Sequence, residues 1–274
     1  MAEAAVDVLV PTRDRACALA VTLTALACQE HCAFDVIVCD QSDGAPGYEG
    51  AEARAAIHVL GARGHRVTLL RNLPRRGLAQ QRQFLLDHAR APRVLFLDDD
   101  VILEPGLLRR LVDALDGAGC GFVGSAVIGL SYRDDLRPHE QAVELWDGKV
   151  EPERILPGSE QWRRHLLHNA ANLWHVQRAL GVDAGRPRLY KLAWVGGCVL
   201  YDSAKLRAAG GFSFWRELPE QHCGEDVLAQ LRVMARFGGC GLMPSGAYHQ
   251  ELPTTVPHRD VDAPRVLAGS LEHA

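Results

Sequence analysis

Short apolar runs alternate with amphipathic stretches along the first 130 residues of the chain. The apolar runs favour strands, whereas the stretches between them space their apolar residues at helical intervals. This βαβ alternation predicts an α/β fold with a mostly parallel sheet covered by helices. The predicted strands are 6–10, 34–39, 67–70, 94–97 and 122–129, and the predicted helices include 16–28, 77–90 and 105–116.

The alternation is lost between residues 130 and 190, where the sequence is charged and contains proline. It returns later in the chain, and a proline-rich tail follows His249. We expect one domain over residues 1–250 and an irregular tail over 251–274. The elements predicted after residue 130 are a helix over 159–180, a strand-like segment over 192–202, and helices over 203–209 and 225–237.

Three polar clusters directly follow predicted strands, at residues 12–15, 40–44 and 98–100. Ligands of parallel α/β sheets bind at the carboxyl ends of the strands. We therefore expect the three clusters to converge on one crevice.

The third cluster places the carboxylates of Asp98, Asp99 and Asp100 behind an apolar run. Two such charges about 4 Å apart repel by roughly 1 kcal/mol in water and by more near a protein interior. One interpretation is that the triplet caps the next helix, although Glu104 and Pro105 already offer a cap-like acid and a proline for its first turn. The other interpretation is a site for Mn²⁺ or Mg²⁺, which bind carboxylate oxygens.

Composition narrows the class of protein. The 274 residues are 47% hydrophobic and 23% charged with a net charge of −4, which predicts a globular chain and no nucleic-acid partner. The eight cysteines have no paired CxxC spacing, so we expect reduced thiols. No apolar stretch approaches the ~18 residues of a membrane span, and the N-terminus lacks the basic region of a secretory signal. We therefore expect no transmembrane segment and a cytoplasmic location.

Several ordered segments of the sequence resemble family 2 glycosyltransferases of the GT-A fold. The resemblance covers roughly residues 5–250 and implies a GT-A (Rossmann-like) domain, with a nucleotide-sugar half of about 1–130 and an acceptor half of about 130–250. The segments that carry it are VLVPTRDR, VIVCDQSDG, RNLPRRGLAQQR, VLFLDDD, WVGGCVLYDSAKLRAAGGF, CGEDVLAQLRV and AYH.

The resemblance implies a site for the nucleotide sugar and its metal ion. Asp40 would bind the base, Asp98 the ribose, and Asp100 a Mn²⁺ or Mg²⁺ ion, with His249 as a second candidate metal ligand. Arg82 would lie near the base or the diphosphate. The full set of implied nucleotide-binding residues is Pro11, Arg13, Asp40, Arg82, Asp98 and Asp99.

The acidic pair Glu225–Asp226 opens the predicted helix 225–237. Acids in a first helical turn also interact favourably with the helix dipole, which is a purely structural explanation for either residue. The resemblance instead implies that Asp226 is the catalytic base and that Glu225 binds acceptor or sugar. It also implies that Gly196, Gly197 and Trp194 lie near the sugar or the acceptor.

The resemblance implies an inverting transferase that moves a sugar from a nucleotide diphosphate sugar, most often a UDP-sugar, to an acceptor hydroxyl or amine. A sugar-phosphate nucleotidyltransferase would be expected to carry a glycine-rich basic loop after the first strand, and residues 10–16 contain no glycine. A non-catalytic nucleotide-sugar binding module remains an alternative. The acceptor, the sugar, the oligomeric state and the choice between UDP, GDP and dTDP stay open, although Trp146, Trp162 and Trp174 are candidates for an acceptor wall.

Overall fold

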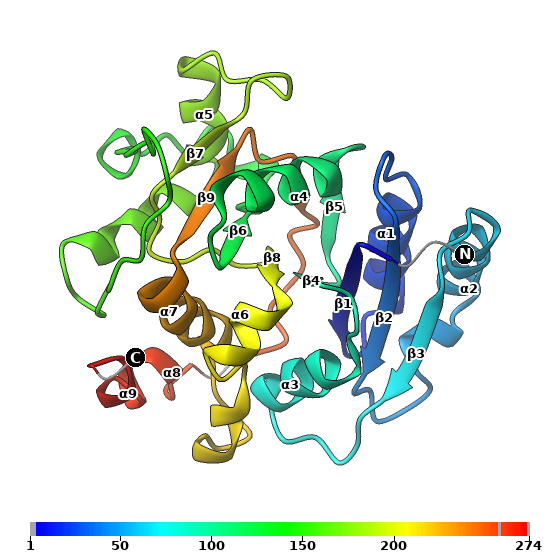
Figure 1. Cartoon of the computed structure of the whole chain (residues 1–274). Helices are drawn as coiled ribbons and strands as arrows, with labels where there is room; N and C mark the ends of the chain where they lie inside the picture. Colours follow the sequence, from blue (N-terminus) through cyan, green and yellow to red (C-terminus); the bar gives the residue numbers. More distant parts are fainter. Residues whose placement is uncertain (1–3, 257–258, 273–274) are drawn as a thin grey trace.

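The computed structural model describes residues 4–256 and 259–272. Its main feature is an eight-stranded sheet with the order β3-β2-β1-β4-β8-β6-β9-β7, in which β8 and β7 run antiparallel to their neighbours (Figure 1). A separate two-stranded sheet pairs β5 with β10. The strands are β1 Val6–Thr12, β2 Phe34–Asp40, β3 Val67–Arg71, β4 Arg93–Leu97, β5 Val101–Leu103, β6 Phe122–Gly124, β7 Arg188–Tyr190, β8 Cys198–Asp202, β9 Gly239–Met243 and β10 Ala247–His249.

Helices cover both faces of this sheet. One hydrophobic cluster joins Leu9 and Phe96 of the sheet to α3, α6 and α7, and the other joins Val8 and Leu95 to α1, α2 and α4. Neighbouring strand residues thus alternate between the two faces, as the period of two along a strand requires. The α-helices are α1 Ala16–Ala27, α2 Ala51–Ala62, α3 Leu78–His88, α4 Leu107–Ala118, α5 Asn172–Ala179, α6 Ser203–Ala208, α7 Glu225–Phe237, α8 Ala263–Val266 and α9 Gly269–Glu272.

The predicted α/β fold is confirmed: six of the eight strands, β3, β2, β1, β4, β6 and β9, run in one direction, and helices cover the sheet. The predicted helix over 159–180 is wrong. A 3₁₀ helix over Gln161–His168 and the short helix α5 replace it, separated by residues 169–171. Ala170 adopts a φ of 47° at this break, a left-handed conformation that an α-helix cannot contain. The predicted strand over 122–129 is also shortened to β6.

Strand β9 was not predicted, because two of its five residues are glycine, which is uncommon within strands. The structure gives the reason for them. A Cβ atom on Gly239 would lie 2.1 Å from the ring of Phe122, and one on Gly241 would lie 2.1 Å from the ring of Tyr190. Two large aromatic rings therefore pack directly on the backbone of β9, where only glycine leaves room.

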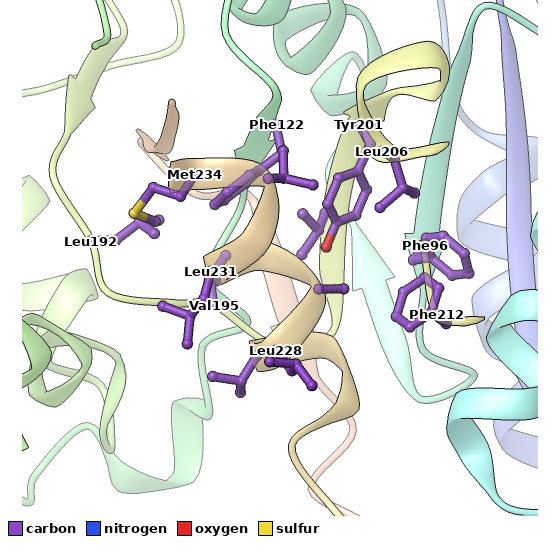
Figure 2. Close-up of a cluster of buried hydrophobic side chains, with 14 of the residues drawn as sticks. Phe96, Phe122, Leu192, Val195, Tyr201, Leu206, Phe212, Leu228, Leu231 and Met234 are labelled. Atoms are coloured by element: carbon purple, nitrogen blue, oxygen red, sulfur yellow. The ribbon is translucent and has the colours of Figure 1, made fainter. Parts of the chain in front are cut away.

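Helix α7 is anchored in the core by its apolar side. Leu228, Leu231 and Met234 are buried and lie among side chains from β6 and β8, including Phe122 and Tyr201 (Figure 2). This packing holds the first turn of α7 in a defined position, which matters because that turn contains the acidic pair.

The tail contains more regular structure than the expected irregular segment. Helices α8 and α9 lie within it, and Ala263 and Leu271 are buried. Helix α8 packs against α7. None of the helices within residues 4–256 and 259–272 is long and apolar enough to cross a membrane.

Candidate active site

A cavity of about 810 Å³ lies where strands β1 and β4 end and helix α7 begins. A second cavity of about 530 Å³ lies at the ends of β1 and β2 and shares Arg13 and Arg15 with the first. The two cavities therefore lie side by side at the carboxyl ends of the strands, where the sequence predicted a crevice. Of the predicted site residues, the larger cavity is lined by Pro11, Arg13, Arg82, Asp98, Asp99, Asp100, Trp194, Glu225, Asp226 and His249.

The three aspartates occupy the turn between β4 and β5, so they precede a strand and do not cap a helix. The backbone N–H of Asp98 donates to the carbonyl of Gly197 at 2.9 Å. The Thr12 hydroxyl donates to the Asp99 carboxylate at 2.6 Å. Burial raises the pKa of Asp99 to about 7, although the bond from Thr12 opposes the shift. The turn thus fixes the three carboxylates in separate environments.

Arg15 pairs with the triplet and was not singled out by sequence reasoning. Its Nη1 lies 2.6 Å from Asp100 Oδ2 and 3.3 Å from Asp99 Oδ1. Its other terminal nitrogen donates to the carbonyl of Pro253 in the tail. One guanidinium therefore pairs with two buried acids and connects the tail to the site.

Asp100 and His249 are the residues that fit a metal ion. His249 Nε2 lies 3.5 Å from Asp100 Oδ2, close enough for one cation to contact both atoms. Among the residues that the structure describes, no three His, Cys, Asp or Glu side chains gather to hold a metal by themselves. An ion at Asp100 would therefore need further ligands from a bound molecule, and it would compete with Arg15 for the same carboxylate oxygen.

Arg82 lies inside the molecule and binds two acids. Its Nε donates to Glu225 Oε1 at 2.9 Å, and its Nη2 donates to Asp98 Oδ1 at 3.0 Å. Burial alone would lower the pKa of Arg82, but Asp98 and Glu225 outweigh that effect and raise it. Arg82 thus connects α3, α7 and the aspartate turn. At least two of its N–H groups therefore donate to acids of the protein itself.

The two acids at the start of α7 have different surroundings. Glu225 is 3% exposed and is held by Arg82. Asp226 keeps some exposed surface on the cavity wall, and its Oδ1 accepts a bond from the backbone N–H of Val227 at 2.9 Å. Burial, and then the neighbouring Glu225, raise the pKa of Asp226 to about 7. A carboxyl group with such a pKa can accept and release a proton near neutral pH.

Asp40 does not line the second cavity. It is 0% exposed, and its two carboxylate oxygens accept the backbone N–H groups of Ser42 at 2.6 Å and Gly47 at 2.7 Å. The next residue, Gln41, does line this cavity. Gln41 Nε2 is buried and has no hydrogen-bond partner within the described residues, whereas Arg13 Nε lies 3.3 Å from Asp14 Oδ2. A base contact by Asp40 stays a prediction, whereas Gln41 is a polar group that sequence reasoning missed.

The two predicted glycines lie behind the acids and do not line either cavity. A Cβ atom on Gly196 would lie 3.7 Å from Asp226 Oδ2. Gly197 has a φ of +80°, and a Cβ atom there would lie 2.6 Å from Val127. These positions therefore allow a tight turn to support Asp98 and Asp226.

Trp194 and Trp162 line the larger cavity together. The ring of His165 stacks on Trp194, with centroids 5.5 Å apart, and also contacts Trp162 at 5.7 Å. Trp146 and Trp174 do not line it; they contact Lys191 and Arg178. Of the three tryptophans predicted as an acceptor wall, only Trp162 faces the cavity.

The tail also contributes to the site. The cavity-lining residues after His249 in the described ranges are Leu252, Thr254, Thr255, Val256, Arg259, Asp260, Asp262, Pro264 and Arg265. No sequence pattern predicted these contacts, and apart from Pro264 and Arg265 of α8 the lining residues lie outside the tail helices.

An α/β sheet of this order, with acidic turns meeting at the carboxyl ends of its strands, defines the GT-A class of glycosyltransferase folds. The chain belongs to glycosyl transferase family 2: the model of that family matches residues 7–177. A search of curated proteins found no match.

Solved structures with the same fold are distant in sequence. S. aureus TarS 1-349 is 15% identical with a TM-score of 0.54, and the match covers 89% of this chain and 60% of that one. Its complex with UDP-GlcNAc is 16% identical with a TM-score of 0.53, covering 92% and 60%. Mannosyltransferase PcManGT from Pyrobaculum calidifontis, in complex with GDP-Man and Mn²⁺, is 16% identical with a TM-score of 0.56, covering 93% and 59%. The chain thus spans about three fifths of the length of these proteins, and the likeness shows the fold.

Proposed function

We propose that the protein is an inverting, metal-dependent glycosyltransferase that moves a sugar from a UDP-sugar to an acceptor hydroxyl or amine. The proposal rests above all on Asp226, a carboxyl group with a pKa near 7 in the same cavity as the aspartate turn. A general base works best when its pKa lies close to the working pH. Membership of glycosyl transferase family 2 supports the same reaction class.

The proposed reaction is a single displacement. The acceptor oxygen or nitrogen forms a bond to the anomeric carbon while the bond from that carbon to the phosphate oxygen breaks. The nucleoside diphosphate leaves with the electron pair, and Asp226 takes the acceptor proton. Because attack and departure occur on opposite sides of the carbon, one displacement inverts its configuration, and no covalent enzyme intermediate is needed.

Asp100 and His249 would hold the metal ion, which supplies positive charge to the departing diphosphate. Arg15 already contacts Asp100 and lies in both cavities, so it is placed to add its own positive charge beside the phosphates. The Mn²⁺ in the PcManGT complex supports the choice of a divalent cation.

The metal assignment predicts a specific loss in an Asp100→Ala variant. Mutating a residue that merely hydrogen-bonds to a metal ligand lowers metal affinity by about 10- to 100-fold, so removing a ligand should lower it at least as much. UDP affinity should be measured by calorimetric titration in the presence of Mn²⁺ and again in the presence of EDTA. The variant should lose most of the gain in UDP affinity that Mn²⁺ gives the wild type. Asp113→Ala, an exposed change on α4, should keep the gain. An equal gain in wild type and Asp100→Ala would remove Asp100 from the metal site.

One unpartnered hydrogen-bond donor supports a uracil base in the smaller cavity. Gln41 Nε2 needs an acceptor, and uracil offers two carbonyl oxygens. The pairing edge of guanine presents the N1–H and the 2-amino group as donors, and that of uracil presents only the N3–H. Because the buried acid of this strand, Asp40, already accepts two backbone N–H groups, uracil leaves fewer donors without an acceptor. The neighbours bind either UDP-GlcNAc or GDP-Man, so they do not decide between the bases.

The base assignment predicts weaker UDP binding by a Gln41→Leu variant. A neutral hydrogen bond contributes about 0.5 to 1.5 kcal/mol, which corresponds to roughly two- to tenfold in affinity. Calorimetry should show this loss for UDP and a smaller one for GDP, while Gln161→Leu, an exposed control, should bind as wild type. Unchanged UDP affinity would place the base elsewhere.

Turnover can be tested before the acceptor is known. Water replaces the acceptor when the enzyme hydrolyses its own nucleotide sugar, and the released UDP can be measured. We expect Mn²⁺-dependent UDP release from at least one member of a panel of UDP-glucose, UDP-galactose and UDP-GlcNAc. Binding of the panel without any release, even after candidate hydroxyl and amine acceptors are added, would favour a non-catalytic binding module.

A further inference from the structure

Arg15 and the proposed metal ion would use the same carboxylate oxygen. Arg15 Nη1 lies 2.6 Å from Asp100 Oδ2, and His249 Nε2 lies 3.5 Å from that atom. Within residues 4–256 and 259–272, Arg15 and His249 are the only hydrogen-bond or ion-pair partners of the Asp100 carboxylate. A cation that binds Asp100 Oδ2 must therefore displace the guanidinium of Arg15.

The other contacts of Arg15 can be replaced or lost at small cost. Its second arm donates to the carbonyl of Pro253, an exposed residue, so water can take over that hydrogen bond. The contact with Asp99 Oδ1 is longer, at 3.3 Å, and Asp99 keeps the 2.6 Å hydrogen bond from Thr12. The main cost of moving Arg15 is thus the broken pair with Asp100, a side chain that is 6% exposed. A buried carboxylate left without a cation is unfavourable, so another positive charge has to replace Arg15.

Arg15 is also placed to meet a nucleotide. Its side chain lines both cavities and is 14% exposed. A nucleotide with its base beside Gln41 in the smaller cavity and its phosphates near Asp100 in the larger one would pass along this side chain. A guanidinium binds phosphate oxygens through two parallel N–H bonds. A diphosphate can therefore replace the carboxylate as the partner of Arg15.

We propose that Arg15 is an exchangeable partner of Asp100. It pairs with that carboxylate until a nucleoside diphosphate binds, and it then turns to the phosphates and leaves Asp100 to a divalent cation. Either ligand alone breaks the pair and leaves one of its two members without a partner, whereas the two ligands together give both members a new one. Nucleotide and cation therefore bind cooperatively, beyond any direct contact between them. The inference rests on the proposed function, because it takes Asp100 as a metal ligand.

The test is the Mn²⁺ affinity of an Arg15→Met variant without nucleotide, measured from the electron paramagnetic resonance signal of free Mn²⁺. Methionine has no charge, so the cation displaces nothing from Asp100 and meets no positive charge beside it. The variant should bind Mn²⁺ more tightly than wild type by about 5- to 150-fold, the usual range for the coupling between two sites. Arg109→Met removes an exposed arginine and should bind as wild type. Adding Asp100→Ala to Arg15→Met should abolish the gain.

The same variant should respond less to Mn²⁺ when it binds UDP. Calorimetric titrations of UDP with Mn²⁺ and with EDTA give the factor by which Mn²⁺ raises UDP affinity. By linkage this factor equals the one by which UDP raises Mn²⁺ affinity, so it should fall in Arg15→Met by about 5- to 150-fold. If Arg15 only bound phosphate, UDP affinity would drop equally in both titrations and Mn²⁺ affinity would not change.

Two results would overturn the proposal. The first is equal Mn²⁺ affinity in wild type and Arg15→Met, including no measurable binding by either. The second is weaker Mn²⁺ binding by the variant, which would mean that Arg15 holds Asp100 in place for the metal. Arg15→Gln is also uncharged and gives the same expectations if Arg15→Met does not fold. Failure of the proposed function is distinguishable: wild type would then show no gain in UDP affinity with Mn²⁺, or Asp100→Ala would keep that gain in full.

Discussion

An Asp226→Asn variant should bind UDP and Mn²⁺ almost as wild type but turn over the nucleotide sugar about 10² to 10⁴ times more slowly, the usual contribution of a positioned general base. The amide keeps the shape of the carboxylate, and it can still accept the N–H of Val227. It cannot take a proton. The loss should therefore appear in kcat, measured as UDP release at saturating nucleotide sugar, and not in the dissociation constant.

The control for this variant is Asp202→Asn. Asp202 caps α6 by accepting the N–H of Lys205, and asparagine caps helices about as well as aspartate. If Asp226 served only the helix, both variants would keep full activity. The wild-type rate should also rise with pH through about 7, since Asp226 must be ionised to act and its pKa is raised to about 7. Lost UDP-sugar binding in Asp226→Asn would instead assign the residue to substrate binding.

An Arg82→Met variant should lose about 3 to 5 kcal/mol of unfolding free energy, the usual cost of removing one partner from a buried ion pair. Methionine fills part of the space, but it leaves Glu225 buried without its cation. Asp98, whose side chain is 37% exposed, can still be solvated. Chemical denaturation followed by circular dichroism measures the difference.

The matched change is Arg109→Met, which removes an arginine from an exposed pair with Asp113. Surface pairs contribute little, so its unfolding curve should nearly overlay that of wild type. If Arg82→Met were equally harmless, the ion pairs of Arg82 with Asp98 and Glu225 would not stabilise the fold. If the unpaired charge of Glu225 causes the loss of stability, adding Glu225→Gln to Arg82→Met should restore part of the unfolding free energy.

Much of the fold could be predicted from the sequence, because the strands of a sheet covered on both faces are apolar runs. Strands β1 to β4 and helices α1, α3, α4, α6 and α7 lie where the spacing of apolar residues predicts them. Prediction failed where tertiary contacts override local preference. Gly239 and Gly241 form a strand because aromatic rings lie on them, and the helix over 159–180 breaks at Ala170.

The candidate site was predictable to a smaller degree. The position of Asp100 at a strand end indicated a site, and the family resemblance indicated Asp226 and His249. All three residues line one cavity in the structure. The arginine that pairs with each acid could not be predicted, because the sequence around an arginine does not indicate which carboxylate it will contact in the fold. Arg15 and the tail residues at the cavity were missed for that reason.

The place of β8 in the sheet affects how the protein is made. Strand β8 lies between β4 and β6, so one edge of β4 stays unpaired until residues 198–202 have been synthesised. Residues 98–197 separate the two strands, which at about 5 to 20 residues per second takes roughly 5 to 20 s. During that time Val94, Leu95 and Leu97, all buried in the finished fold, flank an open strand edge. We therefore expect the nascent chain to be prone to edge-to-edge association until β8 emerges and closes the edge.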